Sequence, residues 1–261
     1  MSENILEINN LSKYFGGLAA VSECSLKVKK GTITGIIGPN GSGKTTLFNL
    51  IAGNLKSSSG SVLFNNENIT DVPSYELFSK GLLRTFQIAH EFTNLSVLEN
   101  LMMVPGNQSG EKLINALLKP SLVAKEESQI KEKAMEVVDF LNLSHLKNEL
   151  AGNLSGGQKK LLELGRTMMV DAKLVLLDEV GAGVNRTLLK DLGTAIEKLN
   201  KEKGYTFCMI EHDMDFIGRL CDPVIVMAEG SVLFEGTVED AKKDEKVIES
   251  YLGRGSKLKG N

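Results

Sequence analysis

One short segment combines glycines, a lysine and a hydroxyl at the spacing that binds phosphate. Gly38-Pro-Asn-Gly-Ser-Gly-Lys44-Thr45 matches the pattern GxxxxGK[ST] at every fixed position. Its glycines allow backbone conformations that turn successive N–H groups toward one anion, and a helix beginning near Lys44 adds the positive end of its dipole. Lys44 can reach the β- and γ-phosphates of a nucleotide, and the Thr45 hydroxyl can coordinate Mg²⁺. The predicted nucleotide contacts here are Gly38, Pro39, Asn40, Gly41, Ser42, Gly43, Lys44, Thr45 and Thr46.

Two adjacent carboxylates follow a second segment of interest. Leu174–Leu177 is a continuous apolar run, which is typical of a strand buried on both faces, so Asp178 and Glu179 should emerge at its carboxyl end. Ligands of open α/β sheets bind at that edge. Asp178 is expected to hold Mg²⁺ through water, and Glu179 to orient and deprotonate the water that attacks the γ-phosphate. An exposed acidic turn is the alternative interpretation.

A parallel sheet is needed to position these residues. Strand Thr32–Ile37 leads into the glycine loop and helix Thr45–Ala52 leaves it, as the loop motif requires. Strands and helices also alternate later in the chain, which favours a parallel sheet covered on both faces. These later elements are predicted as helix Gln158–Met169, strand Leu174–Leu177, helix Thr187–Lys201, strand Tyr205–Ile210, helix Met214–Cys221 and strands Val224–Met227 and Val232–Glu235.

Two further parts lie outside this alternation. Strands Ile5–Leu11 and Ala19–Val28 flank the turn Gly16-Gly17 and should be antiparallel, and Ser61–Phe64 is expected to join them. The stretch from about Ser96 to Leu143 has helical periodicity and interrupts the α/β pattern as an insertion.

The whole-chain composition excludes several classes of protein. The chain has 261 residues, of which 42% are apolar, and a formal net charge of −3 that gives no basic field for nucleic acid. Its three cysteines are far apart and form no CxxC pair, so neither a disulfide framework nor a zinc site is predicted, and a reducing cytosol fits. No segment approaches the ~18 apolar residues of a spanning helix, and no signal peptide is recognisable. The chain is therefore expected to reach a membrane only by docking on other proteins.

A third motif identifies the family that the chain resembles. Leu154-Ser155-Gly156-Gly157-Gln158 precedes a helical run and is followed by the strand that ends at Asp178. Alone, Ser155 would be only a helix N-cap. Between the glycine loop and the paired carboxylates, the segment resembles the signature sequence of the ABC family of ATPases. The resemblance covers nearly the whole chain, and the motifs occur in the order of the family.

The resemblance implies roles for further residues. It places Gln87 as the glutamine that contacts the metal and the attacking water, and His212 as the switch histidine at the γ-phosphate. Phe15 has the position of the aromatic residue that stacks on adenine, with Tyr14 as the alternative. Asn185 would form a hydrogen bond across a dimer interface. The implied catalytic residues are Glu179, His212 and Gln87, and the implied metal ligands are Thr45, Gln87 and Asp178.

Two positions depart from the family pattern. Val180 stands where a proline usually follows the catalytic glutamate, and Arg186 stands where relatives that import branched-chain amino acids usually have proline. Without these prolines the loop is expected to be less rigid, which bears on the rate of hydrolysis but not on the catalytic assignment.

The resemblance also implies a domain organisation. It predicts an α/β fold of the P-loop NTPase (RecA-like) type: a mostly parallel sheet, an N-terminal antiparallel β subdomain and an inserted α-helical subdomain. A single ABC ATPase domain would span residues 1–253. Its catalytic core would take approximately 1–87 and 170–253, its helical subdomain 88–169, and a disordered tail would follow at 254–261.

Partners and location follow from the same family. The signature residues Ser155, Gly156, Gly157 and Gln158 would complete the ATP site of a second ABC ATPase subunit, either another copy or a paralogue. Two transmembrane permease subunits and, indirectly, a periplasmic substrate-binding protein would complete the complex. ATP and Mg²⁺ are the implied cofactors, and no nucleic acid is expected. The implied location is peripheral, at the cytoplasmic face of the inner membrane.

The transported substrate is argued by resemblance alone. Phe15-Gly-Gly-Leu18, Arg84-Thr-Phe-Gln87 and Val97-Leu-Glu-Asn-Leu101 are similar to segments of the importers of branched-chain and related amino acids, as is the ending Val247–Gly253. Transporters of urea and lipopolysaccharide are the alternatives within the family. Soluble ABC ATPases of DNA repair or translation form a different class, and this chain lacks their second cassette, long coiled-coil insertion and zinc module. A small-molecule kinase would leave the signature unexplained.

Overall fold

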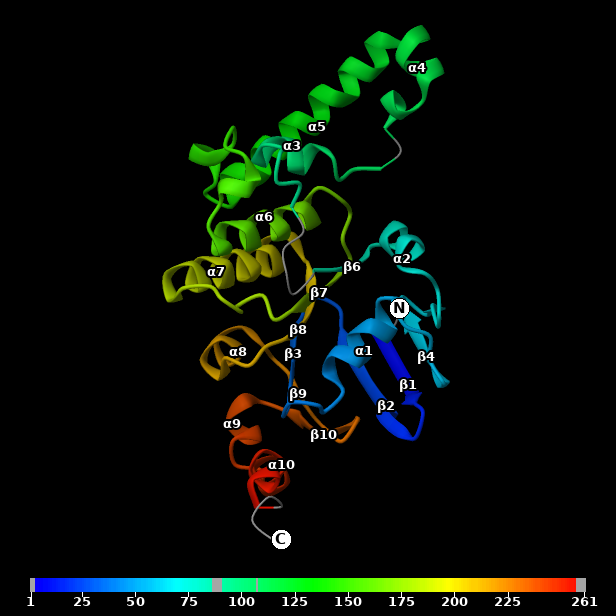
Figure 1. Ribbon diagram of the computed structural model, residues 1–261, viewed down its shortest axis with the longest axis vertical. Helices are drawn as coiled ribbons and strands as arrows, with labels where there is room; N and C mark the ends of the chain where they lie inside the picture. Colours follow the sequence, from blue (N-terminus) through cyan, green and yellow to red (C-terminus); the bar gives the residue numbers. More distant parts are fainter. Residues whose placement is uncertain (1–2, 86–90, 107, 257–261) are drawn as a thin grey trace. The chain divides into compact units, whose positions relative to one another are not determined.

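The computed structural model describes residues 3–85, 91–106 and 108–256 (Figure 1). They form two compact units. The first comprises Met1–Arg84, Lys173–Gly181 and Ile196–Asn261, and the second comprises Thr85–Ala172 and Ala182–Ala195. Residues 182–195, which lie within the predicted catalytic core, cluster with the helical unit in the structure. The predicted domain boundaries remain a prediction.

The first unit begins with an antiparallel sheet in the strand order β2-β1-β4-β5. Its strands are β1 (Asn4–Phe15), β2 (Leu18–Lys29), β4 (Ser59–Phe64) and β5 (Glu67–Asn68). Burial alternates along β2, where Cys24, Leu26 and Val28 face the core and their neighbours face solvent. Strands β1 and β2 extend beyond the predicted ranges as far as the Gly16-Gly17 turn, and Gly16 has the positive φ that this turn requires. The predicted antiparallel start is confirmed.

The second sheet of this unit is mostly parallel. It has the order β10-β9-β3-β8-β7-β6, and only its edge strand β10 is antiparallel to its neighbour. The strands are β3 (Ile33–Ile37), β6 (Leu82–Arg84), β7 (Leu174–Asp178), β8 (Thr206–Ile210), β9 (Val224–Ala228) and β10 (Ser231–Gly236). Every residue of β3, β7 and β8 is buried, as expected for central strands of a parallel sheet that is covered on both faces.

Helices pack against these sheets within the first unit (Figure 1). They are α1 (Lys44–Ile51), α2 (Ser74–Lys80), α8 (Met214–Leu220), α9 (Val238–Ala241), α10 (Glu245–Ser256) and the C-terminal part of α7 (Arg186–Lys203). Leu47, Phe48 and Ile51 of α1 are buried in one core with residues of both sheets. Helix α10 runs to Ser256, so it covers the first residues of the predicted tail, and 257–261 lie outside the described residues.

The second unit is helical. It contains α3 (Val97–Met102), α4 (Leu113–Leu118), α5 (Pro120–Phe140), α6 (Gly156–Met168) and the first part of α7, with short 3₁₀ turns at Ser109–Glu111, Ser144–Leu146 and Ala151–Asn153. Ala134, Val137 and Val138 form the buried face of α5 that the sequence periodicity predicts. Gly165 allows α6 to approach this face, because a Cβ there would lie 2.7 Å from Leu141 Cδ1. Within the described ranges, no helix has both the length and the apolar character to cross a membrane.

Candidate functional site

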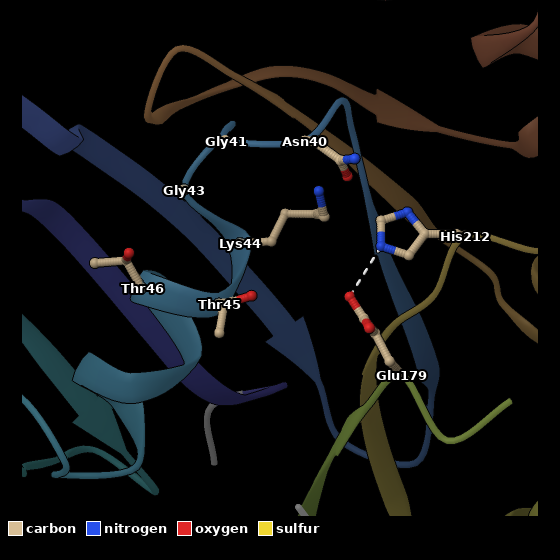
Figure 2. Close-up of a pocket in the computed structure, with 8 residues that line it drawn as sticks. All are labelled: Asn40, Gly41, Gly43, Lys44, Thr45, Thr46, Glu179 and His212. Atoms are coloured by element: carbon tan, nitrogen blue, oxygen red, sulfur yellow. Dashed lines mark hydrogen bonds and ion pairs between the residues drawn. The ribbon is translucent and has the colours of Figure 1, made fainter. Parts of the chain in front are cut away.

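The register of the parallel sheet brings three loops to one edge. Ile210 at the end of β8 pairs with Ile36 of β3 on one side and with Asp178 of β7 on the other. The segments that follow these strands therefore leave the sheet side by side, at the carboxyl ends where α/β folds bind ligands. Figure 2 shows the result: Lys44, Glu179 and His212 come from different segments and point into the same space.

The glycine loop follows a path that side chains would block. Gly38 has φ 148° and Gly43 has φ 99°. A Cβ at Gly38 would collide with the carbonyl oxygen of Met227, and one at Gly43 with that of Ala20. Two of the fixed glycines of the motif are therefore required by the close approach of neighbouring strands. The tightly held loop can direct its backbone N–H groups toward one anion.

Lys44 places its charge at the centre of this loop. Its side chain is almost fully buried, and its ammonium donates to the carbonyl oxygens of Gly38 (2.8 Å) and Pro39 (3.0 Å). These carbonyl contacts hold the ammonium at a fixed position, from which it can attract phosphate oxygens. A pocket opens beside it (Figure 2), and the residues that line this pocket are Asn40, Gly41, Gly43, Lys44, Thr45, Thr46, Glu179 and His212.

Glu179 and His212 are in direct contact across this pocket. Glu179 Oε1 lies 2.9 Å from His212 Nε2. Glu179 has a positive φ of 49°, which is uncommon for a residue with a side chain, and its N–H donates to the carbonyl oxygen of Ile210. The strained backbone thus turns the carboxylate toward the end of β8. A carboxylate held in this way can accept a proton from a water molecule beside the glycine loop.

Asp178 lies one residue earlier and is buried in an ion pair. Arg84 donates from Nη2 to Asp178 Oδ2 at 2.6 Å and from Nη1 to Asn49 Oδ1 at 2.6 Å. The guanidinium therefore ties the end of β7 to β6 and α1. The hydroxyl of Thr45, which lines the pocket, and the carboxylate of Asp178 are both hard oxygen donors. Mg²⁺ prefers such donors and takes several of its ligands from water and phosphate, so these residues fit the metal that the sequence predicts.

Comparisons with known proteins identify the family of the chain. Residues 21–182 match the family model described as ABC transporter. The chain belongs to the ABC transporter family. It is 44% identical to a probable branched-chain amino acid transport ATP-binding protein of Archaeoglobus fulgidus, over 95% of each chain. A protein of the same description from Methanocaldococcus jannaschii is 43% identical and is covered over 97% of its length by 95% of this chain.

The structural comparison gives the same result. An ATP-binding cassette of an ABC transporter, solved in its ADP conformation, superposes on the chain with a TM-score of 0.82 at 40% sequence identity. The match covers 97% of this chain and all of the other. The predicted family and α/β fold are therefore confirmed, and the chain is an ABC ATPase: the nucleotide-binding subunit of a transporter complex.

The predicted signature residues, Ser155, Gly156, Gly157 and Gln158, lie in the helical unit. Ser155 is the N-cap of α6, where its Oγ accepts from the Gln158 N–H while the Gln158 side chain accepts from the Ser155 N–H. Gly157 packs against α7, because a Cβ there would lie 2.5 Å from Leu188 Cδ1. Ser155 and Gly156 are exposed. The capping role expected of an isolated Ser-Gly-Gly turn is present, and the contact with a second subunit remains a prediction.

The remaining predicted site residues are placed as follows. Phe15 and Tyr14 are each 48% exposed, so burial does not distinguish the two candidates for adenine stacking. The Lys13 ammonium lies 5.2 Å from the centroid of the Phe15 ring. Asn185 caps α7 by accepting from the Leu188 N–H at 2.9 Å. Gln87 lies outside the described residues.

Sequence reasoning missed Arg84 and Glu211 as parts of this site. Glu211 follows β8 and is buried, and its carboxylate accepts from the N–H of Gly181 (2.7 Å) and of His212 (3.3 Å). It therefore joins the segment after Glu179 to the backbone of His212. Val180 is also buried. The loop that lacks the usual proline is thus held by side-chain burial and by the bond from Gly181 to Glu211.

Glu211 should make stability depend on pH. Burial raises the pKa of Glu211 above its ordinary value of 4.5, against the opposing effect of its two backbone hydrogen bonds. A carboxyl whose pKa is raised by folding contributes stability below its ordinary pKa and loses that contribution as the pH rises through its folded pKa. The melting temperature of the wild type relative to that of Glu211→Gln should therefore fall as the pH rises above 4.5. Thermal unfolding across this range measures the difference. Glu235→Gln, at an exposed glutamate of β10, is the control. A wild-type melting temperature that rises relative to that of Glu211→Gln as the pH increases would contradict the assignment.

Proposed function

We propose that this ABC ATPase energises the uptake of branched-chain or related amino acids. The proposed ATP hydrolysis rests on one observation: Lys44, Glu179 and His212 line the same pocket beside the glycine loop. The substrate rests on relatives: proteins described as branched-chain amino acid transport ATP-binding proteins match nearly the whole chain at 44% and 43% identity. The substrate itself does not touch an ATPase subunit, so the residues of this chain carry no direct information about its selection.

In this proposal the pocket residues divide the work of ATP hydrolysis. Lys44 and the loop N–H groups bind the β- and γ-phosphates. Glu179 orients a water molecule and accepts its proton as the water oxygen attacks the γ-phosphate, and ADP leaves. His212, 2.9 Å from Glu179, steadies the carboxylate and contacts the γ-phosphate. Thr45, Asp178 and Gln87 would hold Mg²⁺, which neutralises developing phosphate charge when it is bound.

We assign the adenine contact to Phe15 rather than Tyr14. Stacking of a base on an aromatic ring contributes about 1–3 kcal/mol, so Phe15→Ala should weaken ATP binding by roughly 5- to 150-fold. Tyr14→Ala is the matched control, because its side chain is exposed to the same extent. Titration of both variants with a fluorescent ATP analogue measures the effect. A larger loss in Tyr14→Ala would transfer the assignment to Tyr14.

We further propose that two ATPase subunits close on two ATP molecules, with the exposed end of α6 in one subunit facing the phosphates bound to the other. Helix N-termini favour anions, and the signature serine and glycines leave room for one. Ser155→Arg should therefore abolish turnover but leave ATP binding to its own chain unchanged. Asn148→Arg, an exposed site in the same unit, is the control for the added side chain.

Mixing inactive proteins tests whether the site is shared. Lys44→Ala protein retains its signature, and Ser155→Arg protein retains its glycine loop. A mixed dimer therefore has one complete site, and turnover should reappear when the two are combined. If mixing never restores turnover, while the wild-type chain alone is active, the shared site is wrong.

The proposed complex contains two ATPase chains, two transmembrane permeases and a periplasmic binding protein, with the ATPases at the cytoplasmic face of the inner membrane. Deletion of the gene in a strain without a duplicate system should abolish binding-protein-dependent leucine uptake, and the wild-type gene should restore it. A plasmid that encodes Glu179→Gln is the control for loss of hydrolysis alone. Unchanged leucine uptake, together with lost transport of urea or lipopolysaccharide, would reassign the substrate and leave the ATPase assignment intact.

A further inference from the structure

Arg84 bonds to both segments of the described structure that carry a predicted magnesium ligand. Its Nη2 lies 2.6 Å from Asp178 Oδ2, and its Nη1 lies 2.6 Å from Asn49 Oδ1. Asn49 belongs to α1, the helix that begins at Lys44 and carries Thr45 in its first turn. One guanidinium therefore connects the strand that ends at Asp178 to the helix of Thr45.

Strand pairing places Arg84 within reach of both groups. Arg84 ends β6, the edge strand, and pairs with Leu176 of β7, two residues before Asp178. Paired residues of neighbouring strands and alternate residues of one strand have their side chains on the same face of a sheet. Leu176 is buried in one core with Leu47 and Phe48 of α1. The Arg84 side chain therefore lies on the face of the sheet that α1 covers.

Both charges of the pair are buried. The side chains of Arg84 and Asp178 are 12% and 5% exposed. The cost of removing two charges from water offsets much of their attraction, so an apolar pair of similar volume is often as stable as a buried ion pair or more stable. Stability alone therefore gives no reason for an arginine at this position.

The hydrogen bonding of the guanidinium is also incomplete. Arg84 Nε is buried, and among the residues that the structure describes it has no acceptor. A buried donor without an acceptor lowers the stability of a fold. The two bonds from the Nη atoms instead fix the guanidinium between the carboxylate of Asp178 and the amide of Asn49. This arrangement favours a defined orientation of the carboxylate.

We propose that Arg84 is a positioning residue for the magnesium site: it holds the Asp178 carboxylate in one orientation, and Asn49 fixes the guanidinium in turn. The inference rests on the proposed function, in which Asp178 holds Mg²⁺. Both oxygens of a carboxylate can accept, so the bond through Oδ2 leaves Asp178 able to accept from a water molecule bound to the metal. Groups that hydrogen-bond to a metal ligand and orient it typically raise metal affinity by about 10- to 100-fold.

The charge of Arg84 acts in the opposite direction. A guanidinium repels a divalent cation, so loss of the charge alone would strengthen metal binding. If Arg84 mainly orients Asp178, its loss should weaken metal binding. The two effects predict changes of opposite sign, so the direction of the change decides between them.

Equilibrium binding of a non-hydrolysable ATP analogue to the full chain, with Mg²⁺ and with a chelator, tests the proposal. The ratio of the two affinities measures the contribution of the metal and requires no turnover. Arg84→Met should lower this ratio by about tenfold and leave the affinity without Mg²⁺ unchanged. Asn49→Ala keeps both charges and removes only the bond to Nη1, so it should lower the ratio less, by about twofold or more.

A double variant separates positioning from a purely structural role. Because a positioning residue acts through Asp178, Arg84→Met should cause no further loss of the ratio in an Asp178→Asn background. Lys80→Met is the matched control: it removes the cation of an ion pair of the same length, 2.6 Å, between α2 and β5, and should leave the ratio unchanged. Thermal unfolding shows which variants fold, because breaking a buried ion pair can destabilise a protein strongly.

Four results would overturn the proposal. The first is a ratio in Arg84→Met that equals or exceeds that of the wild type. The second is a loss that is equally large without Mg²⁺ or that adds to the loss in Asp178→Asn, which would make Arg84 purely structural. If Arg84→Met does not fold, an unchanged ratio in Asn49→Ala is the third. The fourth is an unchanged ratio in Asp178→Asn itself, which would also refute the proposed metal site, whereas the first three leave that site standing.

Discussion

Glu179→Gln should retain ATP binding and lose roughly 10²–10⁴-fold in turnover, because loss of a general base has an effect of that size. The amide has nearly the shape of the carboxylate but cannot accept the proton of the attacking water. It can keep a hydrogen bond to His212, which now lies 2.9 Å from the carboxylate. The backbone of residue 179 already has a positive φ, and glutamine adds no steric demand there. Steady-state phosphate release and equilibrium ATP titration measure the two quantities separately.

The same substitution should accumulate a closed dimer with ATP bound, since the step that reopens it is blocked. Sedimentation with and without Mg-ATP detects the change in mass. Glu235→Gln, at an exposed position, should behave as the wild type in both assays. If Glu179→Gln hydrolyses ATP at a near-normal rate, the general base is another residue. If it stays monomeric with ATP, the partner is a paralogue or the dimer model fails, and mixing with the paralogue distinguishes the two.

Much of the fold is predictable because its signals are local. The strand before the glycine loop is a short β-branched run, the strand before Asp178 is a continuous apolar run, and both are buried along their whole length. The residues of the glycine loop are contiguous in sequence, so the sequence pattern itself includes the two glycines, Gly38 and Gly43, at positions where a side chain would collide with neighbouring backbone. Edge strand β6 was missed because Leu82–Arg84 is too short to show a period. Its existence depends on pairing with β7, far along the chain.

The contacts that complete the site are not local and could not be read from the sequence. Arg84 meets Asp178 across 94 positions, and Gly181 meets Glu211 across 30. Both contacts depend on the register between strands. A partial signal existed for each: Arg84 begins the segment Arg84-Thr-Phe-Gln87, which is similar to one in the family, and Glu211 is a charged residue directly after a buried strand. Such a residue is either paired or close to a functional site.

The structure also changes how the rigidity of the catalytic loop is understood. Val180 replaces a residue that restricts the backbone, and from sequence this predicts a looser loop. Val180 is buried, and the next N–H donates to the Glu211 carboxylate. Packing and a charge-assisted hydrogen bond can replace the restriction of a proline ring. The position of Glu179 therefore depends on a neighbour that does not line the pocket itself.

Lys44→Ala should weaken ATP binding at least about 10²-fold, because a hydrogen bond from a charged group contributes roughly 1.5–3 kcal/mol and this ammonium faces two phosphates. The lysine is almost fully buried, so little solvent screening reduces its attraction for phosphate. Isothermal titration with a non-hydrolysable ATP analogue measures the affinity. Lys27→Ala, which removes an equal charge from an exposed position on β2, should bind as the wild type does.

The alternative explanation for such a loss is a disordered loop, because Lys44 also donates to the carbonyl oxygens of Gly38 and Pro39. Lys44→Arg distinguishes the two causes. It preserves the charge but presents a larger planar guanidinium, and arginine and lysine are not equivalent at phosphate sites. If charge at this point binds the phosphates, Lys44→Arg should retain more affinity than Lys44→Ala, while both melt near the wild-type temperature. Near-normal affinity in Lys44→Ala would instead show that the backbone N–H groups of the loop bind the phosphates without the lysine.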